Sequence, residues 1–269
     1  MIEATVKQTL KKIGLNKKEK ILVALSGGKD SSVVAYLLKK LGYNIEGIHI
    51  NLHMGNYSEK CLEATKKLCK QLEIKLHIYD IKEKMGSSMC YIRGSIQQEK
   101  GLKNCAICGV IKKWILNKAA RELHADKIAT GHHLDDEIQT FMLNIFKGSP
   151  ELNANTGAIN RNAEKKEFVP RIKPLFYVLE DDIREYSKKM KLPAVYEKCP
   201  CAIDSYRIQI RDFISSLSRK EKENLMKNFE QILKKLPRQN NNVKTCKICG
   251  EPSRNNICRM CQLMKIKRK

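Results

Sequence analysis

Eleven cysteines, most of them in close pairs, are the residues of this chain with the clearest chemical potential. Cys105 and Cys108 form one CxxC pair, and Cys199 and Cys201 flank a single proline. An odd number of cysteines argues against a framework of disulfides, so the thiols are free to bind metal ions or carry sulfur. A CxxC pair can be a redox pair, half of a zinc site or part of an iron–sulfur site, and the pair alone does not decide among these.

A second group of cysteines lies near the C-terminus and has the spacing of a zinc site. Two CxxC pairs there can supply four thiolates with tetrahedral reach. So small a piece has no hydrophobic core of its own without a metal. Its many lysines and arginines lead us to interpret it as an RNA-gripping ribbon, with a structural cap and a solvated tail as the alternative. The predicted zinc ligands are Cys246, Cys249, Cys258 and Cys261.

The segment Ser26–Ser32, with the sequence SGGKDSS, falls directly between a predicted strand and a predicted helix. Glycine at such a turn lets the backbone approach a ligand, and the free amide groups of a helix N-terminus favour a phosphate there. Lys29 adds a cation, and Ser31 and Ser32 add hydroxyl donors. The spacing does not fit the GxxxxGK[ST] pattern of a Walker A loop. An ordinary glycine-rich turn would not need these residues in this order.

A pair of adjacent acids follows another predicted strand, within the sequence TGHHLDD of Thr130–Asp136. Asp135 and Asp136 could hold Mg²⁺ on the phosphates of a nucleotide, because Mg²⁺ prefers carboxylate oxygen. The acids could instead be simple partners of the helix dipole. The neighbouring His132 and His133 could bind a metal ion or merely pack, since adjacent histidines are a weak signal.

The charge of the chain points to a polyanionic partner. Lysine and arginine number 52 against 29 acids, which gives a net charge of +23. A positive field of this size attracts nucleic acid and speeds its encounter with the protein. No apolar run approaches the roughly 20 residues that span a bilayer, and the first 20 residues form no signal-peptide core. We therefore expect a cytoplasmic protein with no membrane partner.

The loops that carry these residues must be brought together by a scaffold, and strand and helix patterns alternate over the first half of the chain. This alternation favours a parallel sheet with helices on both faces, whose ligands bind at the carboxyl ends of the strands. Met85–Asn104 breaks the rhythm and is expected to be an irregular insertion. Ser149–Lys166 is expected to be a flexible loop, and Ser218 and Glu221 form a capping box at the start of a last helix. The predicted strands are Lys20–Leu25, Ile45–Ile50, Ile74–Tyr79, Lys127–Thr130 and Phe168–Tyr177, and the predicted helices include Val110–Leu123, Asp135–Phe146, Asp181–Met190 and Ser218–Leu236.

The SGGKDSS loop resembles the SGGxDS signature of the PP-loop ATP pyrophosphatases. This resemblance implies that ATP is cleaved between its α and β phosphates and that AMP is transferred to a carbonyl or amide oxygen of the substrate. It also implies an α/β fold with a parallel five-stranded sheet of the adenine-nucleotide α-hydrolase type, followed here by a small C-terminal zinc ribbon. The residues assigned to ATP and Mg²⁺ are Ser26, Gly27, Gly28, Lys29, Asp30, Ser31, Ser32, Gly131, His132 and Asp135.

Further motifs resemble the tRNA 2-thiolation enzymes of the TtcA/TtuA family. Cys105–Lys112 fits the pattern CxxCGxxK, Gly131–Asp136 fits GHxxDD, Cys199-Pro200 fits a third cysteine before proline, and Tyr57-Ser58 fits a Tyr-Ser pair. The resemblance covers most of the chain, from the first strand to the C-terminus. It is closest to the TtuA branch, although residues 1–20 lack the cysteines and histidines of the zinc finger that TtuA-type relatives carry there. TtcA-type relatives lack the terminal zinc ribbon.

The family resemblance implies a [4Fe-4S] cluster held by Cys105, Cys108 and Cys199, with one iron left open for sulfide. Cys201 is the alternative third ligand and could also carry a persulfide. The implied reaction is adenylation of the uridine C2 oxygen by ATP and attack of a cluster-bound sulfide or a persulfide on C2, which expels AMP. Lys112 and Asp136 are then assigned to act near the reacting base.

Several questions stay open at this point. The modified nucleotide could be position 54 or 34 of tRNA, with cytidine 32 less favoured, and the sulfur donor could be sulfide, a persulfide or a thiocarboxylated ubiquitin-like protein. Relatives suggest a homodimer. Cys61 and Cys69 fall on or near the apolar side of a predicted helix and are expected to be core residues, and Cys90 has no assignment. Two other functions compete: an ATP-dependent amidotransferase or ligase acting on a small molecule, and a non-catalytic iron–sulfur and zinc RNA-binding protein. The expected divisions are a helix over 1–19, the PP-loop domain over 20–217, a helix and linker over 218–242 and the zinc ribbon over 243–269.

Overall fold

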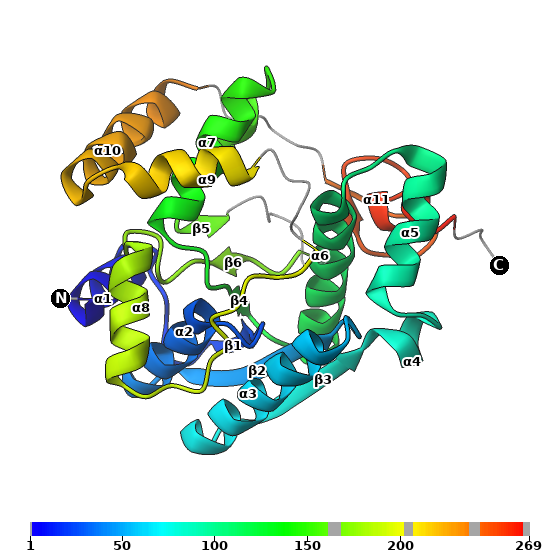
Figure 1. Cartoon of the computed structure of the whole chain (residues 1–269), viewed down its shortest axis with the longest axis horizontal. Coiled ribbons are helices and arrows are strands. Elements are labelled where there is room, and N and C mark those ends of the chain that lie inside the picture. Colours follow the sequence, from blue (N-terminus) through cyan, green and yellow to red (C-terminus); the bar gives the residue numbers. More distant parts are fainter. Residues whose placement is uncertain (1, 161–167, 202–206, 237–242, 266–269) are drawn as a thin grey trace.

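A computed structural model of the chain describes residues 2–160, 168–201, 207–236 and 243–265. A twisted sheet crosses the centre of the molecule, with helices on both faces, and the C-terminal module lies to one side against α5 and α6 (Figure 1). Within the described part, no helix is long and apolar enough to cross a membrane. The predicted linker residues Gln239–Asn242 and most of the basic tail lie outside the described residues.

The sheet has six strands rather than the five that we predicted, in the order β3-β2-β1-β4-β6-β5. Five of them are parallel, and β5 is an antiparallel edge strand paired with β6. The additional strand β5 falls inside the segment that we expected to be a flexible loop. It escaped prediction because two residues carry no readable periodicity. The strands are β1 (Lys20–Ala24), β2 (Asn44–Asn51), β3 (Leu76–Asp80), β4 (Lys127–Ala129), β5 (Ile159–Asn160) and β6 (Arg171–Ile172).

The helices cover the sheet in two groups. The N-terminal helix α1 joins α2, α3 and α8 in the largest apolar core, in which Val33, Leu37 and Ile183 are fully buried. On the other side, Ala120 of α6 packs against Leu22 of β1 in a separate core. Figure 1 shows α6 standing between the sheet and the C-terminal module. The helices named here are α1 (Ile2–Lys12), α2 (Lys29–Lys40), α3 (Asn56–Leu72), α6 (Asn104–Glu122) and α8 (Glu180–Lys189).

Three helices pack together over the end of the sheet nearest β5. Helix α7 (Leu134–Phe146) contacts α9 (Arg207–Ser216) and α10 (Arg219–Lys235), and Phe141 stacks on Phe229 with ring centroids 3.8 Å apart. The capping box predicted at the start of α10 is present, since Ser218 and Glu221 exchange hydrogen bonds.

The segment that we expected to be irregular contains two helices, α4 (Ile81–Met85) and α5 (Met89–Lys100). Met89 and Ile92 of α5 are buried against α6, and Ser88 caps the helix through the amide of Tyr91. We overlooked α5 because its apolar stripe is short and Gly94 interrupts it, so that tertiary contacts stabilise it more than its own pattern does.

The C-terminal module contains a small hairpin and one short helix. Strands β7 (Lys244–Thr245) and β8 (Pro252–Ser253) pair in antiparallel fashion, and α11 (Arg259–Leu263) follows. Met260 and Leu263 are buried in a core shared with α5 and α6. The module is therefore docked on the main domain rather than carried on a free tether.

Candidate active site

The SGGKDSS loop connects β1 to α2 in a conformation that only glycine allows. Gly27 has a φ of 82°, and a Cβ added to it would lie 2.6 Å from the Cα of Cys61 on α3. Gly28 is the N-cap of α2 and has no side chain to cover the first amide groups of the helix. The turn is held by Ser31, whose hydroxyl donates to the carbonyl of Gly28 at 3.0 Å. These features leave a helix N-terminus open to a phosphate.

Lys29 is buried within this loop and paired with two carboxylates. Its Nζ lies 2.9 Å from Asp30 Oδ1 and 2.9 Å from Glu180 Oε1. Burial alone would lower the pKa of Lys29, but the charges of Asp30 and Glu180 raise it above its ordinary value. Lys29, which we predicted to bind the phosphates, must therefore release Asp30 or Glu180 before it can contact a phosphate group. Glu180 could not be predicted as a partner of Lys29, because it lies far along the chain at the start of α8.

The GHHLDD segment meets the SGGKDSS loop at the carboxyl ends of β4 and β1. A Cβ on Gly131 would lie 2.8 Å from the backbone nitrogen of Ser31, so glycine permits the close approach of the two loops. His132 Nδ1 lies 2.9 Å from the hydroxyl of Thr130. The structure thus brings together the two segments that we assigned to the nucleotide.

His133 is buried between the two acids of this motif. Its Nδ1 lies 3.7 Å from Asp135 Oδ2, and its Nε2 lies 3.4 Å from Asp136 Oδ2. Burial alone would lower the pKa of His133, but the negative charges of Asp136 and Asp135 raise it to about 9. His133 is therefore a buried cation at neutral pH.

Asp135 and Asp136 have different surroundings. Asp135 accepts a hydrogen bond from the amide of Glu180 at 2.8 Å, and its other oxygen lies 2.9 Å from Nζ of Lys222 on α10. Although burial opposes ionisation, hydrogen bonds from His133 and Lys222 hold the pKa of Asp135 well below its usual range. These contacts favour a structural role for Asp135, and its assignment to Mg²⁺ stays a prediction. Asp136 is more exposed, with 21% of its side chain accessible.

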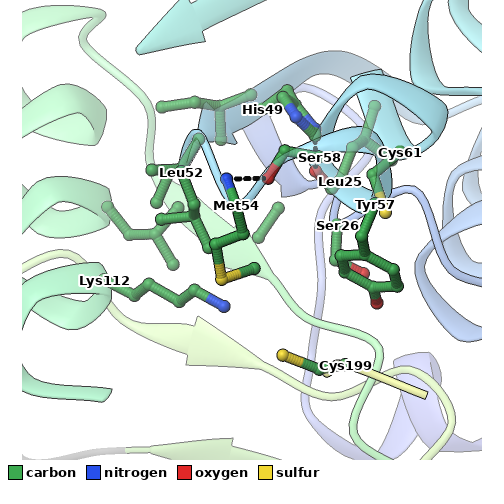
Figure 2. A pocket seen from close by; sticks show the side chains of 14 residues that line it. Leu25, Ser26, His49, Leu52, Met54, Tyr57, Ser58, Cys61, Lys112 and Cys199 are labelled. Atoms are coloured by element: carbon green, nitrogen blue, oxygen red, sulfur yellow. Dashed lines mark hydrogen bonds between the residues drawn. The ribbon is translucent and has the colours of Figure 1, made fainter. Parts of the chain in front are cut away.

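A cavity of about 150 Å³ lies beside the nucleotide loop. Figure 2 shows Lys112 extending from α6 into this cavity, with Cys199 and Tyr57 on other parts of its wall. Ser26 of the loop also lines it, so the cavity joins the nucleotide loop to Lys112 and Cys199. Its remaining lining is largely apolar and includes Leu25, Ile48, Ile50, Leu52 and Met54.

Cys61 also lines the cavity, although we expected it to be an ordinary core residue. It is 4% exposed, and burial raises the pKa of its thiol while a hydrogen bond from Tyr57 opposes that shift. The helical pattern of α3 places Cys61 on its apolar side and therefore predicts a core residue. Its place on the cavity wall becomes visible only in the structure, where α3 contacts the nucleotide loop. Cys69, on the same helix, is a core residue as predicted.

The three cysteines assigned to a cluster lie near the N-terminal end of α6. Cys105 is exposed and Cys108 is half-buried in the first turns of that helix, and Cys199 lines the cavity near enough to Cys108 for the two thiols to interact. Burial raises the pKa of Cys199, the charge of Cys108 adds to this effect, and Lys112 opposes it. Among the described residues, these sulfurs do not converge on one point within 4.8 Å as the C-terminal four do. A cubane differs from a single ion in this respect, since each thiolate binds its own iron.

Cys201 and Cys90 share a different partner. The Nη2 of Arg93 donates to Cys201 Sγ at 2.8 Å and to Cys90 Sγ at 3.3 Å. Cys201 is thus engaged by an arginine, whereas Cys199 faces the cavity, which favours Cys199 as the third cluster ligand. Arg93 could not be predicted as a site residue, because an arginine inside a segment without clear periodicity carries no recognisable signal.

The four C-terminal cysteines meet as their spacing predicts. One sulfur from each of them lies within 4.8 Å of the others, the arrangement expected of a tetrahedral zinc site. Burial opposes the charge of Cys246, but amide groups of Cys258 and Cys249 lower its pKa to about 6. The donor set and its amide hydrogen bonds therefore fit Zn²⁺.

The zinc module is attached to α6 through hydrogen bonds between side chains. Glu251 is buried and accepts hydrogen bonds from Asn117 at 2.7 Å and from Arg121 at 2.7 Å. Trp114 Nε1 donates to Cys249 Sγ at 3.4 Å. These contacts support the structural alternative for the module, because they tie it to the helix that carries Cys108 and Lys112.

The fold and this site define an α/β protein with a phosphate loop beside a thiol-lined cavity. The PP-loop domain family matches residues 1–216. The chain is 38% identical over 272 residues to the tRNA-5-methyluridine(54) 2-sulfurtransferase of Pyrococcus horikoshii, covering 99% of this chain and 85% of that protein. It is 29% identical over 262 residues to the tRNA 2-thiolation protein NcsA of Haloferax volcanii, covering 90% and 81%.

A solved structure agrees over the whole chain. The U34-tRNA thiolase NcsA from Methanococcus maripaludis, determined with its [4Fe-4S] cluster, superposes with a TM-score of 0.81 at 28% identity and covers 100% of this chain and 89% of its own. The chain therefore belongs to the PP-loop family, in its branch of tRNA 2-thiolation proteins.

Proposed function

We propose that this chain is an ATP-dependent tRNA uridine 2-sulfurtransferase that forms AMP. The observation that carries the proposal is that Ser26 of the nucleotide loop, Lys112 and Cys199 line one and the same cavity. An adenylating enzyme that delivers sulfur needs the α-phosphate, a cation and the sulfur source within reach of one carbonyl group. Its net charge of +23 suits a tRNA substrate.

The nucleotide loop prepares ATP for attack on its α-phosphate. The open amide groups of α2 and the hydroxyl groups of the loop hold the phosphates, and Lys29 moves from Glu180 to a phosphate oxygen as ATP enters. The uridine then enters the apolar cavity, which excludes water from its C2 carbonyl group.

Lys112 and Asp136 are the groups that we assign to the reacting base. The ammonium of Lys112 lies in the cavity, where it stabilises the negative charge that passes to AMP as it leaves. Asp136 is the less buried acid of its pair and lies at the start of α7 beside the nucleotide loop. It is suited to accept the proton that the uridine ring gives up.

A [4Fe-4S] cluster fits the residues present. Cys105, Cys108 and Cys199 are free thiols around one end of α6, with the cations of Lys112 and Arg93 close to Cys199 and Cys108 respectively. When bound, the cluster would supply the sulfur atom that replaces the C2 oxygen. The sulfur source of the cell, whether sulfide, a persulfide or a thiocarboxylated ubiquitin-like protein, stays a prediction, as do the homodimer and the cytoplasmic location.

We further propose uridine 54 as the target. Three relatives named for position 54 are 38%, 30% and 28% identical to this chain, whereas NcsA proteins of two archaea are 29% and 28% identical, so the most similar of these relatives is one named for position 54. Unmodified tRNA with a U54C substitution and tRNA with a U34C substitution separate the two targets. Sulfur incorporation that survives U54C and is lost with U34C would move the target to the anticodon.

The proposed function is tested by measuring AMP release and thiolation in parallel, on anaerobically purified protein with unmodified tRNA. Wild-type protein should release AMP only when tRNA is added and should give 2-thiouridine. Cys199→Ser should still release AMP but lose thiolation, because adenylation does not need the sulfur. AMP release with a small amide acceptor but not with tRNA would favour the ligase, and no AMP release at all would favour an RNA-binding protein.

Metal analysis of the same preparations tests the cluster ligands. We expect a cubane content of iron and sulfide that is lost in Cys105→Ala and Cys199→Ala but kept in Cys201→Ala. Loss in Cys201→Ala with retention in Cys199→Ala would move the third ligand to Cys201.

A further inference from the structure

Arg93 on α5 is a buried cation whose described partners are sulfur atoms. It is 5% exposed, and its Nη2 contacts Cys201 Sγ at 2.8 Å and Cys90 Sγ at 3.3 Å. In the described part of the chain, no carboxylate forms an ion pair with it, and its Nε has no hydrogen-bond partner at all. Burial alone would lower the pKa of Arg93, but the neighbouring sulfur atoms, first that of Cys201 and then those of Cys90 and Cys108, raise it.

A buried guanidinium of this kind requires an anion. Removing its charge from water costs several kcal/mol unless a negative partner compensates it, and each unmet N–H group adds a further cost. Among the described residues the hydrogen-bond acceptors of Arg93 are sulfur atoms, so a negatively charged sulfur species formed beside them would compensate its charge. Both thiols accept from Nη2, so the N–H group of Nε remains as a further donor.

We propose that Arg93, Cys201 and Cys90 form a sulfur-loading site, at which Cys201 accepts a sulfane sulfur atom from a persulfide donor. Arg93 holds the resulting persulfide, with its free Nε donating to the added terminal sulfur. The proposal rests on the proposed function only in assigning the loaded sulfur to tRNA. It adds a sulfur-carrying residue that is distinct from the three cluster ligands.

The loading step is a thiol–persulfide exchange. The thiolate of Cys201 attacks the terminal sulfur of the donor R–S–SH, the donor S–S bond breaks, and its electron pair leaves on the donor sulfur. The proton of the terminal sulfur passes to that leaving group, which gives R–SH and a deprotonated persulfide on Cys201. Atoms and electrons balance without an added oxidant or reductant, and the same exchange can hand the sulfur to a second thiolate.

The position of the two thiols gives each a separate part. Cys90 is exposed, so the outer side of the site is open to a donor. Cys201 is half-buried, and its sulfur lies 3.9 Å from the sulfur of Met54, which lines the cavity of Lys112 and Cys199. The Cys201 sulfur therefore lies between solvent and the reaction cavity, as a carrier of sulfur would need to.

The test is direct detection of the added sulfur. Cluster-loaded protein is treated anaerobically with glutathione persulfide, without ATP or tRNA, then alkylated, digested and analysed by mass spectrometry. We expect the mass of one extra sulfur on the peptide of Cys201, and a decrease in this loading by roughly tenfold or more in Arg93→Met, since a charge-assisted hydrogen bond is lost. Arg93→Lys, which keeps the charge, should retain part of the loading.

Matched variants keep the result interpretable. Arg171→Met removes a half-buried arginine, whose Nη2 donates to the carbonyl of Lys113 rather than to sulfur, and should load normally. Cys201→Ser leaves Arg93 intact and should fold like the wild type, as judged by its melting temperature, while losing the label. Equal loading in Arg93→Met and wild type, or label on Cys105 and Cys108 but not on Cys201, would overturn the proposal.

Thiolation and AMP release measured on the same samples separate the two proposals. Normal thiolation without any label on Cys201 sinks the loading site and leaves the enzyme function standing. Label on Cys201 in a protein that never modifies tRNA supports the loading site and removes the function instead.

Discussion

Nζ of Lys222 lies 2.9 Å from Oδ1 of Asp135, so that a helix near the end of the described chain holds an acid beside the nucleotide loop. Both side chains are buried, with 8% and 6% of their areas exposed. The pair links α10 to the carboxyl end of the sheet, where ATP is proposed to bind. Helix α10 is therefore part of the support of the site rather than an appendage.

Removal of this lysine should destabilise the fold. Lys222→Met leaves Asp135 as a buried charge that has lost one of its cations, and such a loss costs about 3 kcal/mol. Denaturant unfolding followed by circular dichroism measures the change. Lys234→Met, on the exposed side of the same helix, should change the free energy of unfolding by less than about 0.5 kcal/mol. Equal effects of the two substitutions would contradict the structural role of the pair.

Stability should fall as pH rises from about neutral to alkaline, because of His133. The pKa of His133 is raised to about 9 in the folded state, against an unfolded value of about 6.5. Its contribution, up to about 3 kcal/mol, is therefore fully present below about pH 6.5 and is lost as pH rises through about 9. The free energy of unfolding, measured from pH 6 to about 10, should decline in the wild type and stay flatter in His133→Gln. Parallel curves would show that His133 does not titrate in this window.

Glu180→Gln should tighten ATP binding. The substitution removes one of the two carboxylates that hold Lys29, so the ammonium can turn to a phosphate at lower cost. We expect the dissociation constant of ATP, measured by calorimetry, to fall by roughly threefold to tenfold. Glu185→Gln, an exposed acid of the same helix, is the control and should leave the constant unchanged. Weaker binding in Glu180→Gln would mean that Glu180 itself helps to hold the nucleotide.

Zinc removal should be visible in the fluorescence of Trp114, the only tryptophan of the chain. Its indole donates to Cys249 Sγ at 3.4 Å and is packed against the C-terminal module. A strong chelator should unfold the module and shift the emission to the red as water reaches the indole. Added Zn²⁺ should restore the original spectrum, and Glu251→Gln should make the shift occur at lower chelator concentration. An unchanged spectrum after metal analysis has shown zinc loss would contradict this docking.

Local patterns in the sequence predicted most of the scaffold and the nucleotide loop. The SGGKDSS turn, the capping box of Ser218 and the spacing of the zinc ligands each lie within a few residues, so their geometry follows from neighbours along the chain. The same holds for the long parallel strands, whose apolar runs are continuous. The edge strand β5 and the short helix α5 were missed because tertiary packing, rather than their own periodicity, stabilises them.

The long-range partners could not be predicted in this way. Arg93 meets Cys201 across 108 residues of sequence, and Lys29 meets Glu180 across 151. Nothing in either neighbourhood marks these pairs, since buried ion pairs depend on the final packing of separate elements. Cys61 shows the opposite problem, because its apolar helical position predicted a core residue correctly but hid its place on the cavity wall.

Helix α6 carries residues of the sulfur site, the cavity and the interface with the C-terminal module. Its first turns bear Cys108, its middle sends Lys112 into the cavity, and its later turns hold the zinc module through Trp114 and Arg121. Each residue added to or removed from a helix rotates everything beyond it by about 100°. A single insertion between Cys108 and Arg121 would therefore rotate the residues that contact the C-terminal module away from the orientation they now have relative to Cys108. This would hold whatever residue was inserted. We therefore expect related chains to differ in this helix by substitutions rather than by insertions or deletions.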